Sequence, residues 1–302
     1  MLHRPVLAVD LGKSRCRVAM SGPNGQTVSE GIGSPGLAAA GGVEAALAAI
    51  LPLTSDTAAY GAVSVGAAGA WAAPAAASEL AQRLHSRLDV PVAVTSDVVS
   101  AHAGALDGGE GVLLIAGTGA AALGIDGDGI RLIDGWGPEV GDLGSGSWFG
   151  RAAVRAALRA SAGLVGPTAL SAGVEAMIGP IDGIQAWLSR DEPLARRLAA
   201  LAPVVLNVAA DGDAVAGQIA GEGARLLVDS AVAASARSTR VALHGGLTQH
   251  DWFRGVLADS LRTAGREPVD AVGDALDGAR LIAERAGAGD PLPHERFVRR
   301  AG

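Results

Sequence analysis

The sequence contains little cysteine, lysine or aromatic residue. Cys16 is the only cysteine among 302 residues, which excludes an intramolecular disulfide, a cysteine-ligated iron–sulfur cluster and an all-cysteine zinc site. A lone thiol is typical of a reducing compartment, so we expect a cytoplasmic protein. Lys13 is the only lysine among 24 basic residues. This bias, with abundant alanine and glycine, indicates a GC-rich genome, so surface arginines carry little functional information.

Excess positive charge and strongly apolar runs are also lacking. The 24 basic residues face 31 acidic ones, and a net charge of −7 argues against a protein built around nucleic-acid phosphates. The opening stretch MLHRPVLAVDLG lacks the apolar region and cleavage site of a secretory signal. Residues 57–78 carry no charge, but they are mostly alanine and glycine and include Pro74. Their transfer to a membrane is weakly favourable, so we expect buried structure there.

What the sequence does contain is a repeated strand, glycine turn and strand. Residues 6–9 form an apolar run that ends at Asp10 and a turn, and residues 15–20 resume as a strand. The pattern returns in residues 112–115 and 121–125, on either side of a second glycine turn. This echo indicates a duplicated α/β unit.

The rest of the chain is predicted to be mainly helical. We expect turns at 23–25, strands at 62–65, 91–95 and 241–244, and helices at 43–51, 79–88, 98–106, 147–162, 168–178, 182–189, 193–209, 212–236, 251–264 and 271–286. The Pro- and Arg-rich tail that follows is expected to fray. Because no low-complexity linker separates two domains, we expect two joined lobes with a cleft.

The first turn invites a comparison with a Walker A loop. Gly12-Lys13-Ser14 fails that pattern, because Leu7 stands where the loop requires a glycine. The same turn can instead offer backbone amides and the Ser14 hydroxyl to phosphate, while Asp10 holds a hydrated Mg²⁺. A plain Asx-type turn that closes a hairpin is the alternative.

Two further segments are candidates for phosphate chemistry. The turn Gly117-Thr118-Gly119 allows close approach of a phosphate and adds a hydroxyl donor, or it is an ordinary hairpin turn. Ser96-Asp97 follows a strand, and ligands of open α/β sheets gather at the carboxyl ends of strands. Asp97 is therefore placed to orient and deprotonate an attacking hydroxyl. The alternative, which can coexist, is that Asp97 caps the helix that follows.

Two glycine-rich stretches complete the set. Residues 135–146 hold five glycines, a proline and a tryptophan, and Asp142 among them would accept hydrogen bonds from substrate hydroxyls, unless the stretch is an irregular loop without a role. Ser145 or Ser147 could cap the next helix. Gly245-Gly246 would let the backbone approach a flat ligand such as adenine. His244 and His250 have no acidic or cysteine partner at ligand spacing, which argues against a metal site there.

In this order the motifs resemble the BadF/BadG/BcrA/BcrD ATPase family, the branch of the actin-like ATPase and sugar-kinase superfamily that includes N-acetylglucosamine kinases. The resemblance implies an α/β fold of two ribonuclease-H-like lobes around a nucleotide and sugar cleft. The first lobe would span residues 1–105 plus a C-terminal helix at about 283–302, and the second residues 106–282.

The resemblance also implies roles for individual residues. The cofactors would be ATP and Mg²⁺, with the metal held through water by Asp10 and with Asp97 as the base that activates the sugar 6-hydroxyl. Nucleotide binding would involve Asp10, Gly12, Lys13, Ser14, Gly117, Thr118, Gly119, Gly245 and Gly246. Sugar binding would involve Asp97, Thr118, Gly135, Trp136, Gly137, Glu139 and Asp142.

Four positions depart from the family pattern, and they bear on the sugar rather than on the phosphates. Leu143 replaces a usual Glu, Glu139-Val140 replaces two apolar residues, Ser34-Pro35 replaces Asn-Pro, and Ala120 replaces a frequent Ser. Glu139 would place a carboxylate that favours an amino sugar.

We therefore predict a kinase that converts an amino sugar, N-acetylglucosamine first, to its 6-phosphate. Glucosamine or another hexose is an alternative substrate, and a non-catalytic sugar sensor or regulatory ATPase is an alternative class. An activator ATPase that holds an iron–sulfur cluster at a dimer interface is excluded, because such a cluster takes four thiolates and Cys16 gives a symmetric dimer only two. The expected partner is a small sugar, without nucleic acid or membrane. A homodimer is compatible with the sequence.

Overall fold

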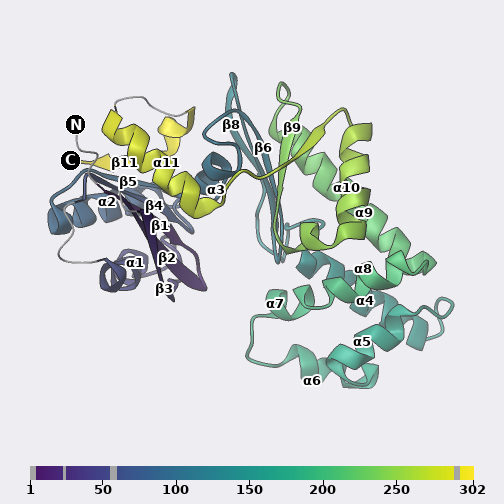
Figure 1. The fold of residues 1–302 in the computed structure, drawn as a ribbon. Helices are drawn as coiled ribbons and strands as arrows, with labels where there is room; N and C mark the ends of the chain where they lie inside the picture. The colour runs from purple at the N-terminus through teal and green to yellow at the C-terminus, as the bar shows by residue number, and fades with distance from the viewer. Residues whose placement is uncertain (1–4, 23–24, 55–59, 289–292) are drawn as a thin grey trace. The chain divides into compact units, whose positions relative to one another are not determined.

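A computed structural model describes residues 5–22, 25–54, 60–288 and 293–302. The chain forms two compact units (Figure 1). Unit 1 comprises Met1–Glu110, Asp128–Ile130 and Asp270–Gly302, and unit 2 comprises Gly111–Gly127 and Arg131–Val269. Both are mixed α/β units built around one sheet, so the expected fold class is confirmed.

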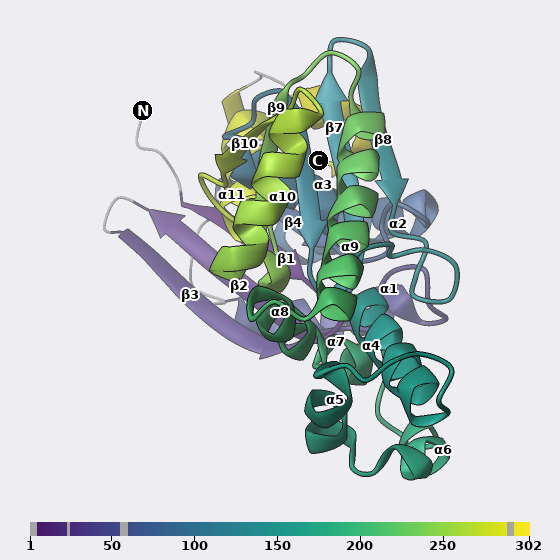
Figure 2. The same cartoon turned by 90° about the vertical axis from the view of Figure 1, so that its right-hand side faces the viewer.

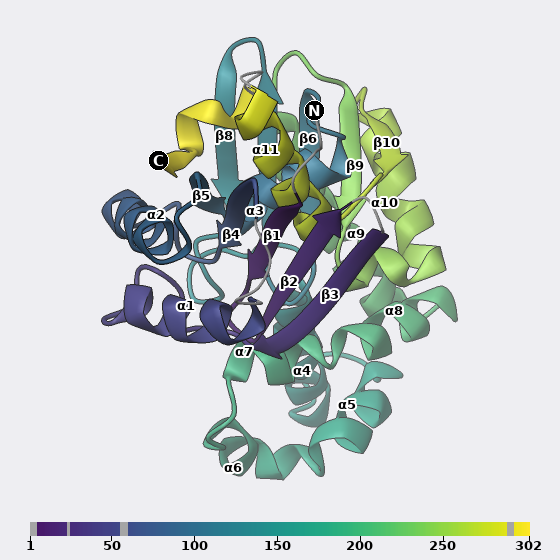
Figure 3. The same cartoon turned by 60° about the vertical axis from the view of Figure 1, so that its left-hand side comes forward.

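Unit 1 is built on a six-stranded sheet in the order β11-β5-β4-β1-β2-β3 (Figure 3). Its strands are β1 (Val6–Leu11), β2 (Arg15–Gly22), β3 (Gly25–Ile32), β4 (Ala62–Ala67), β5 (Val92–Ser96) and β11 (Arg299–Ala301). The first three strands form an antiparallel meander, β4 and β5 run parallel to β1, and β11 pairs antiparallel with β5.

Alternation along β1 assigns its side chains to two different faces of this sheet. Leu7 and Val9 pack into a core with α1 (Gly42–Ile50) and α2 (Pro74–Leu88). Ala8 packs on the other face, against α11 (Ala275–Ala288). The same period places Asp10, two residues after Ala8, on the face of α11. That face also carries α3 (Asp97–Ala105), which packs against α11 and β4.

Unit 2 is built on a five-stranded sheet in the order β10-β9-β6-β7-β8 (Figure 2). Its strands are β6 (Gly111–Ala116), β7 (Ala120–Asp126), β8 (Gly129–Asp134), β9 (Arg240–His244) and β10 (Glu267–Asp270). Its helices are α4 (Gly146–Ser161), α5 (Leu170–Ile178), α6 (Ile184–Leu188), α7 (Leu194–Ala199), α8 (Ala202–Ala210), α9 (Ala214–Ala234) and α10 (Asp251–Thr263). One core joins the sheet to these helices, with Phe149 edge-to-face on Phe253 at 5.3 Å.

The duplicated pattern predicted from the sequence is present. In unit 2 as in unit 1, two antiparallel strands meet at a glycine turn, and a later strand pairs parallel with the first of them, β9 with β6. The sequence reading missed β3, β8 and β10. β3 is mostly exposed, β10 has only four residues, and β8 (GIRLID) is largely half-buried without strict apolar alternation. Of the turn expected at 23–25, Pro23 and Asn24 lie outside the described residues.

Two predictions of secondary structure are wrong. The helix expected at 193–209 is divided into α7 and α8, and Pro203 lies in the first turn of α8, where its missing N–H costs nothing. The described residues 293–302 are neither frayed nor part of a helix running from about 283 to 302. After α11 ends, the described tail forms a short 3-10 helix, η4 (Pro293–Phe297), and β11, which is held by pairing to β5.

Among the described helices, none taken singly is both long and apolar enough to span a membrane, although Leu194–Ala210 and Ala214–Ala234, bent by 117° at their junction, pass the length and composition test as a pair.

Candidate active-site residues in the two units

Asp10 in unit 1 forms an ion pair inside its own hairpin. The register of β1 and β2 places Arg17 directly opposite Asp10. Arg17 donates to Asp10 Oδ2 from Nη2 at 2.7 Å and from Nε at 3.1 Å, with each side chain less than a fifth exposed. Because both bonds end on Oδ2, they fix the orientation of the carboxylate and leave Oδ1 out of this pair.

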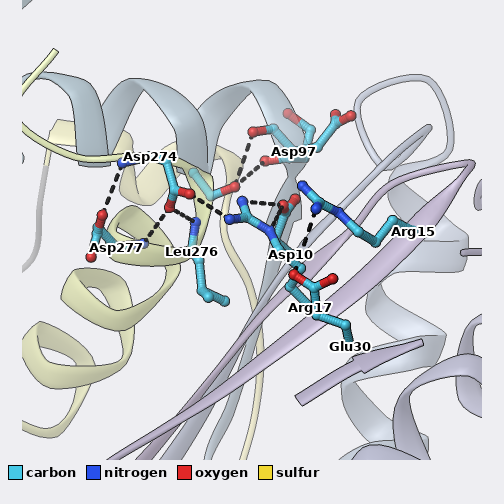
Figure 4. Close-up of polar contacts among 10 residues, drawn as sticks. Asp10, Arg15, Arg17, Glu30, Asp97, Asp274, Leu276 and Asp277 are labelled. Atoms are coloured by element: carbon cyan, nitrogen blue, oxygen red, sulfur yellow. Dashed lines mark hydrogen bonds and ion pairs between the residues drawn. The ribbon is translucent and has the colours of Figure 1, made fainter. Parts of the chain in front are cut away.

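Arg17 also connects Asp10 to the start of α11 (Figure 4). Its Nη1 donates to Asp274 Oδ2 at 2.5 Å, and the other oxygen of Asp274 accepts the backbone N–H groups of Leu276 and Asp277 at 2.8 and 3.2 Å. Asp274 therefore caps the first turn of α11 while it holds Arg17. The Arg17 guanidinium lowers the pKa of the Asp274 carboxyl, against the opposing effect of its burial.

The sequence analysis did not predict either Arg17 or Asp274 as a partner in this ion-pair network with Asp10. Arg17 could have been found, because a hairpin that turns at residues 12–14 pairs position 10 with position 17. Asp274 gives a weaker signal, since the predicted helix at 271–286 placed it inside the helix rather than before its first turn.

The turn after Asp10 is closed by a bond from Gly12 N–H to the Arg15 carbonyl oxygen at 2.9 Å. A second strand end is packed on it, since Ser34 N–H donates to the Gly12 carbonyl oxygen at 3.2 Å. Lys13 and Ser14 are exposed at the tip. The turn thus closes a hairpin through a bond between backbone groups, and it also presents a cationic and a hydroxyl side chain to solvent.

Asp97 is the first residue of α3, directly after β5, and is partly buried. Ser96, not Asp97, is the capping residue, because its hydroxyl accepts the Val99 N–H. Burial raises the pKa of the Asp97 carboxyl above its ordinary value, the N–H of Val98 opposes this, and the negative charge of Asp10 adds to it. Asp10, near the end of β1, and Asp97, at the start of α3, lie near each other (Figure 4).

In unit 2 the turn Gly117-Thr118-Gly119 is supported by the start of α4. The N–H groups of Gly146 and Ser147 donate to the carbonyl oxygens of Gly117 and Thr118 at 2.8 and 3.2 Å. Of the two serines predicted as caps of α4, Ser145 is the capping residue, because its Oγ accepts the Trp148 N–H. These two bonds from the start of α4 fix the backbone of the turn.

The loop 135–146 is held by Asp134, which sequence reasoning missed. Asp134 is 4% exposed, and its two oxygens accept the N–H groups of Asp142 and Leu143 at 2.7 Å each. Gly141 passes so close that a Cβ there would lie 2.5 Å from Asp134 Oδ1. Asp134 is the last residue of β8, a strand that was not predicted, and the only sequence signal was an acidic residue at the entrance of the glycine-rich loop.

This arrangement brings Asp142 to the second glycine turn. A Cβ on Gly119 would meet Asp142 Oδ2 at 2.9 Å, so the carboxylate lies against that turn. Burial raises the pKa of Asp142, the N–H of Ala120 opposes this, and the charge of Asp134 adds to it. Trp136 and Glu139 of the same loop are exposed, Trp136 by 67%.

A pocket of about 280 Å³ in unit 2 unites two of the predicted nucleotide segments. One side is formed by Gly117, Thr118 and Gly146, and Gly246 and Leu247 also line it. Most of the remaining wall is apolar and was not predicted from the sequence: Ala199, Ala202, Pro203 and Leu206, from α7 and α8, line it together with the polar His250. Such a slot between glycine backbone and aliphatic side chains suits a flat, largely apolar ring.

Gly245 lines an adjoining open pocket of about 610 Å³ and has a steric requirement of its own. Its φ is +111°, and a Cβ there would lie 2.5 Å from the Ala116 carbonyl oxygen.

His250 caps α10 and its Nε2 lies 3.0 Å from Asn207 Oδ1. Across the described ranges, no three His, Cys, Asp or Glu side chains form a cluster that could hold a metal ion.

The family is decided by a match over most of the chain. The model of the BadF/BadG/BcrA/BcrD ATPase family matches residues 7–283. The chain belongs to this ATPase family. The resemblance noted in the sequence is thus confirmed, and the use of ATP follows from the family. No curated protein sequence matches the chain significantly.

Solved structures share the fold. A Chromobacterium violaceum protein solved under the name "Putative N-acetylglucosamine Kinase" is 25% identical, with a TM-score of 0.76 over 93% of this chain and 99% of that one. A Porphyromonas gingivalis protein of the same name is 22% identical, with a TM-score of 0.72 over the same shares. A ROK family glucokinase from Streptomyces griseus, in complex with glucose and AMPPNP, is 18% identical with a TM-score of 0.54, over 93% of this chain and 99% of that one.

Proposed function

We propose that this ATPase-family protein is a sugar kinase that transfers the γ-phosphoryl group of ATP to the 6-hydroxyl of an amino sugar, N-acetylglucosamine first. The observation that carries the proposal is Asp97. It is a partly buried carboxylate with a raised pKa, it follows a sheet strand, and it shares its environment with Asp10. A general base needs a pKa moved toward the working pH, and burial supplies that shift here.

The residues of unit 1 would manage charge and the proton. Asp97 would accept the proton of the sugar hydroxyl as that oxygen attacks, and Lys13 and the turn amides would balance negative charge on the phosphates. Ser14 would add a hydroxyl donor. Arg17, held between Asp10 and Asp274, would keep the Asp10 carboxylate in one orientation.

Mg²⁺ suits the groups present. Magnesium usually keeps several waters and binds through one or two carboxylates plus substrate phosphates, rather than in an all-protein cage. Asp10 supplies one such carboxylate, with Oδ1 outside the Arg17 pair, and the described residues contain no competing cluster of ligands. When bound, the ion would neutralise phosphate charge.

The residues of unit 2 would bind by shape and by hydrogen bonds. Gly117, Thr118 and Gly119 would contact phosphates, and the slot of Gly246 with the α7–α8 wall would take adenine. Asp142, fixed by Asp134 against the second turn, would accept hydrogen bonds from sugar hydroxyls, with Gly135, Trp136, Gly137 and Glu139 on the same loop. We place this activity in the cytoplasm. Homodimer formation stays a prediction.

The test is ATP- and Mg²⁺-dependent release of ADP with a panel of sugars, with mass detection of the product. The panel is N-acetylglucosamine, glucosamine, N-acetylmannosamine, N-acetylmuramic acid and glucose. One sugar well ahead of the others, recovered as its 6-phosphate, supports the proposal and identifies the substrate. ADP release without any phosphorylated sugar would contradict it and favour a regulatory ATPase.

A further inference from the structure

The last residues of the chain build one wall of a pocket in unit 1. The family match ends at residue 283, so η4 and β11 lie beyond it. They are nevertheless firmly attached. The Thr95 hydroxyl donates to the Phe297 carbonyl oxygen at 3.0 Å, and the Trp71 and Phe297 rings stack at 4.5 Å between centroids, inclined by only 5°.

The pocket lies at the edge of the sheet where β4 and β5 end. Trp71 comes from the loop after β4, Pro74 from the first turn of α2, Ser96 from the end of β5, and Phe297 and Arg299 from the C-terminal segment. Its volume is about 260 Å³, which is room for roughly eight water molecules at about 30 Å³ each. It is therefore of small-molecule size. Ser96 precedes Asp97, so the pocket adjoins the strand end that carries the candidate base.

Arg299 gives this pocket an uncompensated positive charge. In the part of the chain that the structure describes, no carboxylate pairs with its guanidinium, and the side chain is partly buried. Its neighbour Arg300 differs in each respect: it is exposed and forms two bonds with Glu295, at 2.5 and 2.7 Å. Successive strand residues face opposite sides of a sheet, so the free cation and the paired cation point apart.

A second feature adds to the positive potential. The cap residue of α2 is Ala73, which makes no side-chain cap bond, and Pro74 follows it. The first N–H groups of this fifteen-residue helix therefore lack a side-chain acceptor, and a helix start favours negative charge. Helix start and guanidinium meet in one cavity beside an aromatic wall.

We propose that this pocket binds the anionic group, carboxylate or phosphate, of a sugar-sized molecule, with Arg299 as its counter-charge. An arginine offers paired donors that match both oxyanions. The stacked Trp71 and Phe297 supply the apolar surface against which the body of the ligand packs. The proposal needs no turnover, so it stands apart from the proposed kinase activity.

The experiment is calorimetric titration of the full chain, without ATP and at fixed ionic strength, with three probes that share one sugar. N-acetylglucosamine 6-phosphate carries a phosphate, N-acetylmuramic acid carries a carboxylate, and N-acetylglucosamine is neutral. At least one anionic probe should bind, and Arg299→Gln should weaken it by about 10- to 100-fold, the range expected for a lost charged hydrogen bond. Binding of the neutral sugar should be unchanged by that substitution.

Arg300→Gln is the matched control, because it removes the same charge one residue away, and it should leave all three affinities unchanged. Arg299→Lys should restore part of the anion affinity, because lysine returns the positive charge without the paired donors. Unchanged binding of N-acetylglucosamine by Arg299→Gln shows that this variant is folded. If the anion is part of a sugar substrate, N-acetylglucosamine will compete with the anionic probe, whereas a separate effector will bind together with it. Equal losses in Arg299→Gln and Arg300→Gln, or no preference for the anions in the wild type, would overturn the proposal.

Discussion

Unit 1 and unit 2 carry the same hairpin with opposite chemistry. In each unit two antiparallel strands meet at the glycine turn, and we compare the second cross-strand residue pair counted back from that turn. This pair is Asp10 with Arg17 in unit 1 and Ile115 with Ala121 in unit 2. On the neighbouring parallel strand, the residue that pairs with Asp10 is Gly66 of β4, and the residue that pairs with Ile115 is His244 of β9. At this level unit 1 therefore has an ion pair between its hairpin strands, whereas unit 2 has an uncharged pair between its hairpin strands beside His244.

The difference teaches how a duplicated fold divides a task. In unit 1 the turn is surrounded by side-chain charges, which can hold a metal and move a proton. In unit 2 the turn is fixed by backbone bonds from α4 and by close glycine packing, which suits recognition of shape. The same strand pattern builds both sheets, and the residues at the turns decide what each can do.

The largest expected effect tests whether unit 1 alone carries the proton transfer. Asp97→Asn should lower kcat by about 10²- to 10⁴-fold, the usual contribution of a general base, and leave ATP affinity nearly intact. Asp142→Asn in unit 2 should instead raise the KM for sugar more than it lowers kcat. Steady-state kinetics with the preferred sugar measures both. Turnover above a few per cent of wild type in Asp97→Asn would remove Asp97 from this role.

The next effect tests whether unit 2 depends on backbone geometry. Gly245→Ala should lower the free energy of unfolding by about 3 kcal/mol, because its φ is +111° and the new Cβ would meet the Ala116 oxygen. Gly246→Ala is the control: a Cβ there meets nothing within 4 Å, and the expected change is within about 0.5 kcal/mol. Urea unfolding compares the two. Similar stabilities would show that Gly245 is not required sterically.

A smaller effect concerns the ion pairs of unit 1. Arg17→Met should lower the free energy of unfolding by about 2 kcal/mol, because it leaves Asp10 and Asp274 without their shared cation. Arg17→Lys should recover only part of this, since a point charge cannot reproduce the forked bonds to both carboxylates. Arg15→Met removes an exposed pair with Glu30 at 3.5 Å and should cost less than about 1 kcal/mol. If Arg15→Met and Arg17→Met lowered the free energy of unfolding equally, the ion pairs of Arg17 with Asp10 and Asp274 would not stabilise unit 1 more than an exposed pair does.

The effect that is smallest at neutral pH, and grows on acidification, is an acid sensitivity assigned to unit 1. His294 is fully buried, with Nε2 3.0 Å from His102 Nδ1; burial first, and the positive charge of His102 second, lower the pKa of His294 to about 3. Below its ordinary value of 6.5 the unfolded chain takes up a proton that the folded chain refuses, so stability falls as the pH drops from 6.5 toward 3.

The slope from this one group approaches about 1.4 kcal/mol per pH unit. Urea unfolding at a series of pH values measures it. His294→Leu should flatten the profile, whereas His244→Gln in unit 2 should not. A slope that is the same in wild type and His294→Leu would assign the acid sensitivity to other groups.

Local patterns predicted the repeated core well. Continuous apolar runs at 6–9 and 112–115, each followed by a glycine turn, were enough to indicate two sheets, because a strand buried on both faces needs continuous small and aliphatic residues. The C-terminal strand β11 was not predicted, because its residues carry no local strand pattern. β11 is only three residues long and holds two arginines, so its strand exists only because β5 offers a free edge.

The sequence by itself determined the two hairpins, the position of Asp97 after a strand and the motifs that mark the family, since these depend on neighbours along the chain. Only the tertiary structure decided that Asp274 meets Arg17 257 residues away, that Asp134 holds Asp142, that α7 and α8 wall the glycine pocket, and that Arg299 lies beside Trp71. Long-range ion pairs and pocket walls join elements whose packing is set by all the apolar contacts of a unit at once, and no local periodicity records which elements those will be.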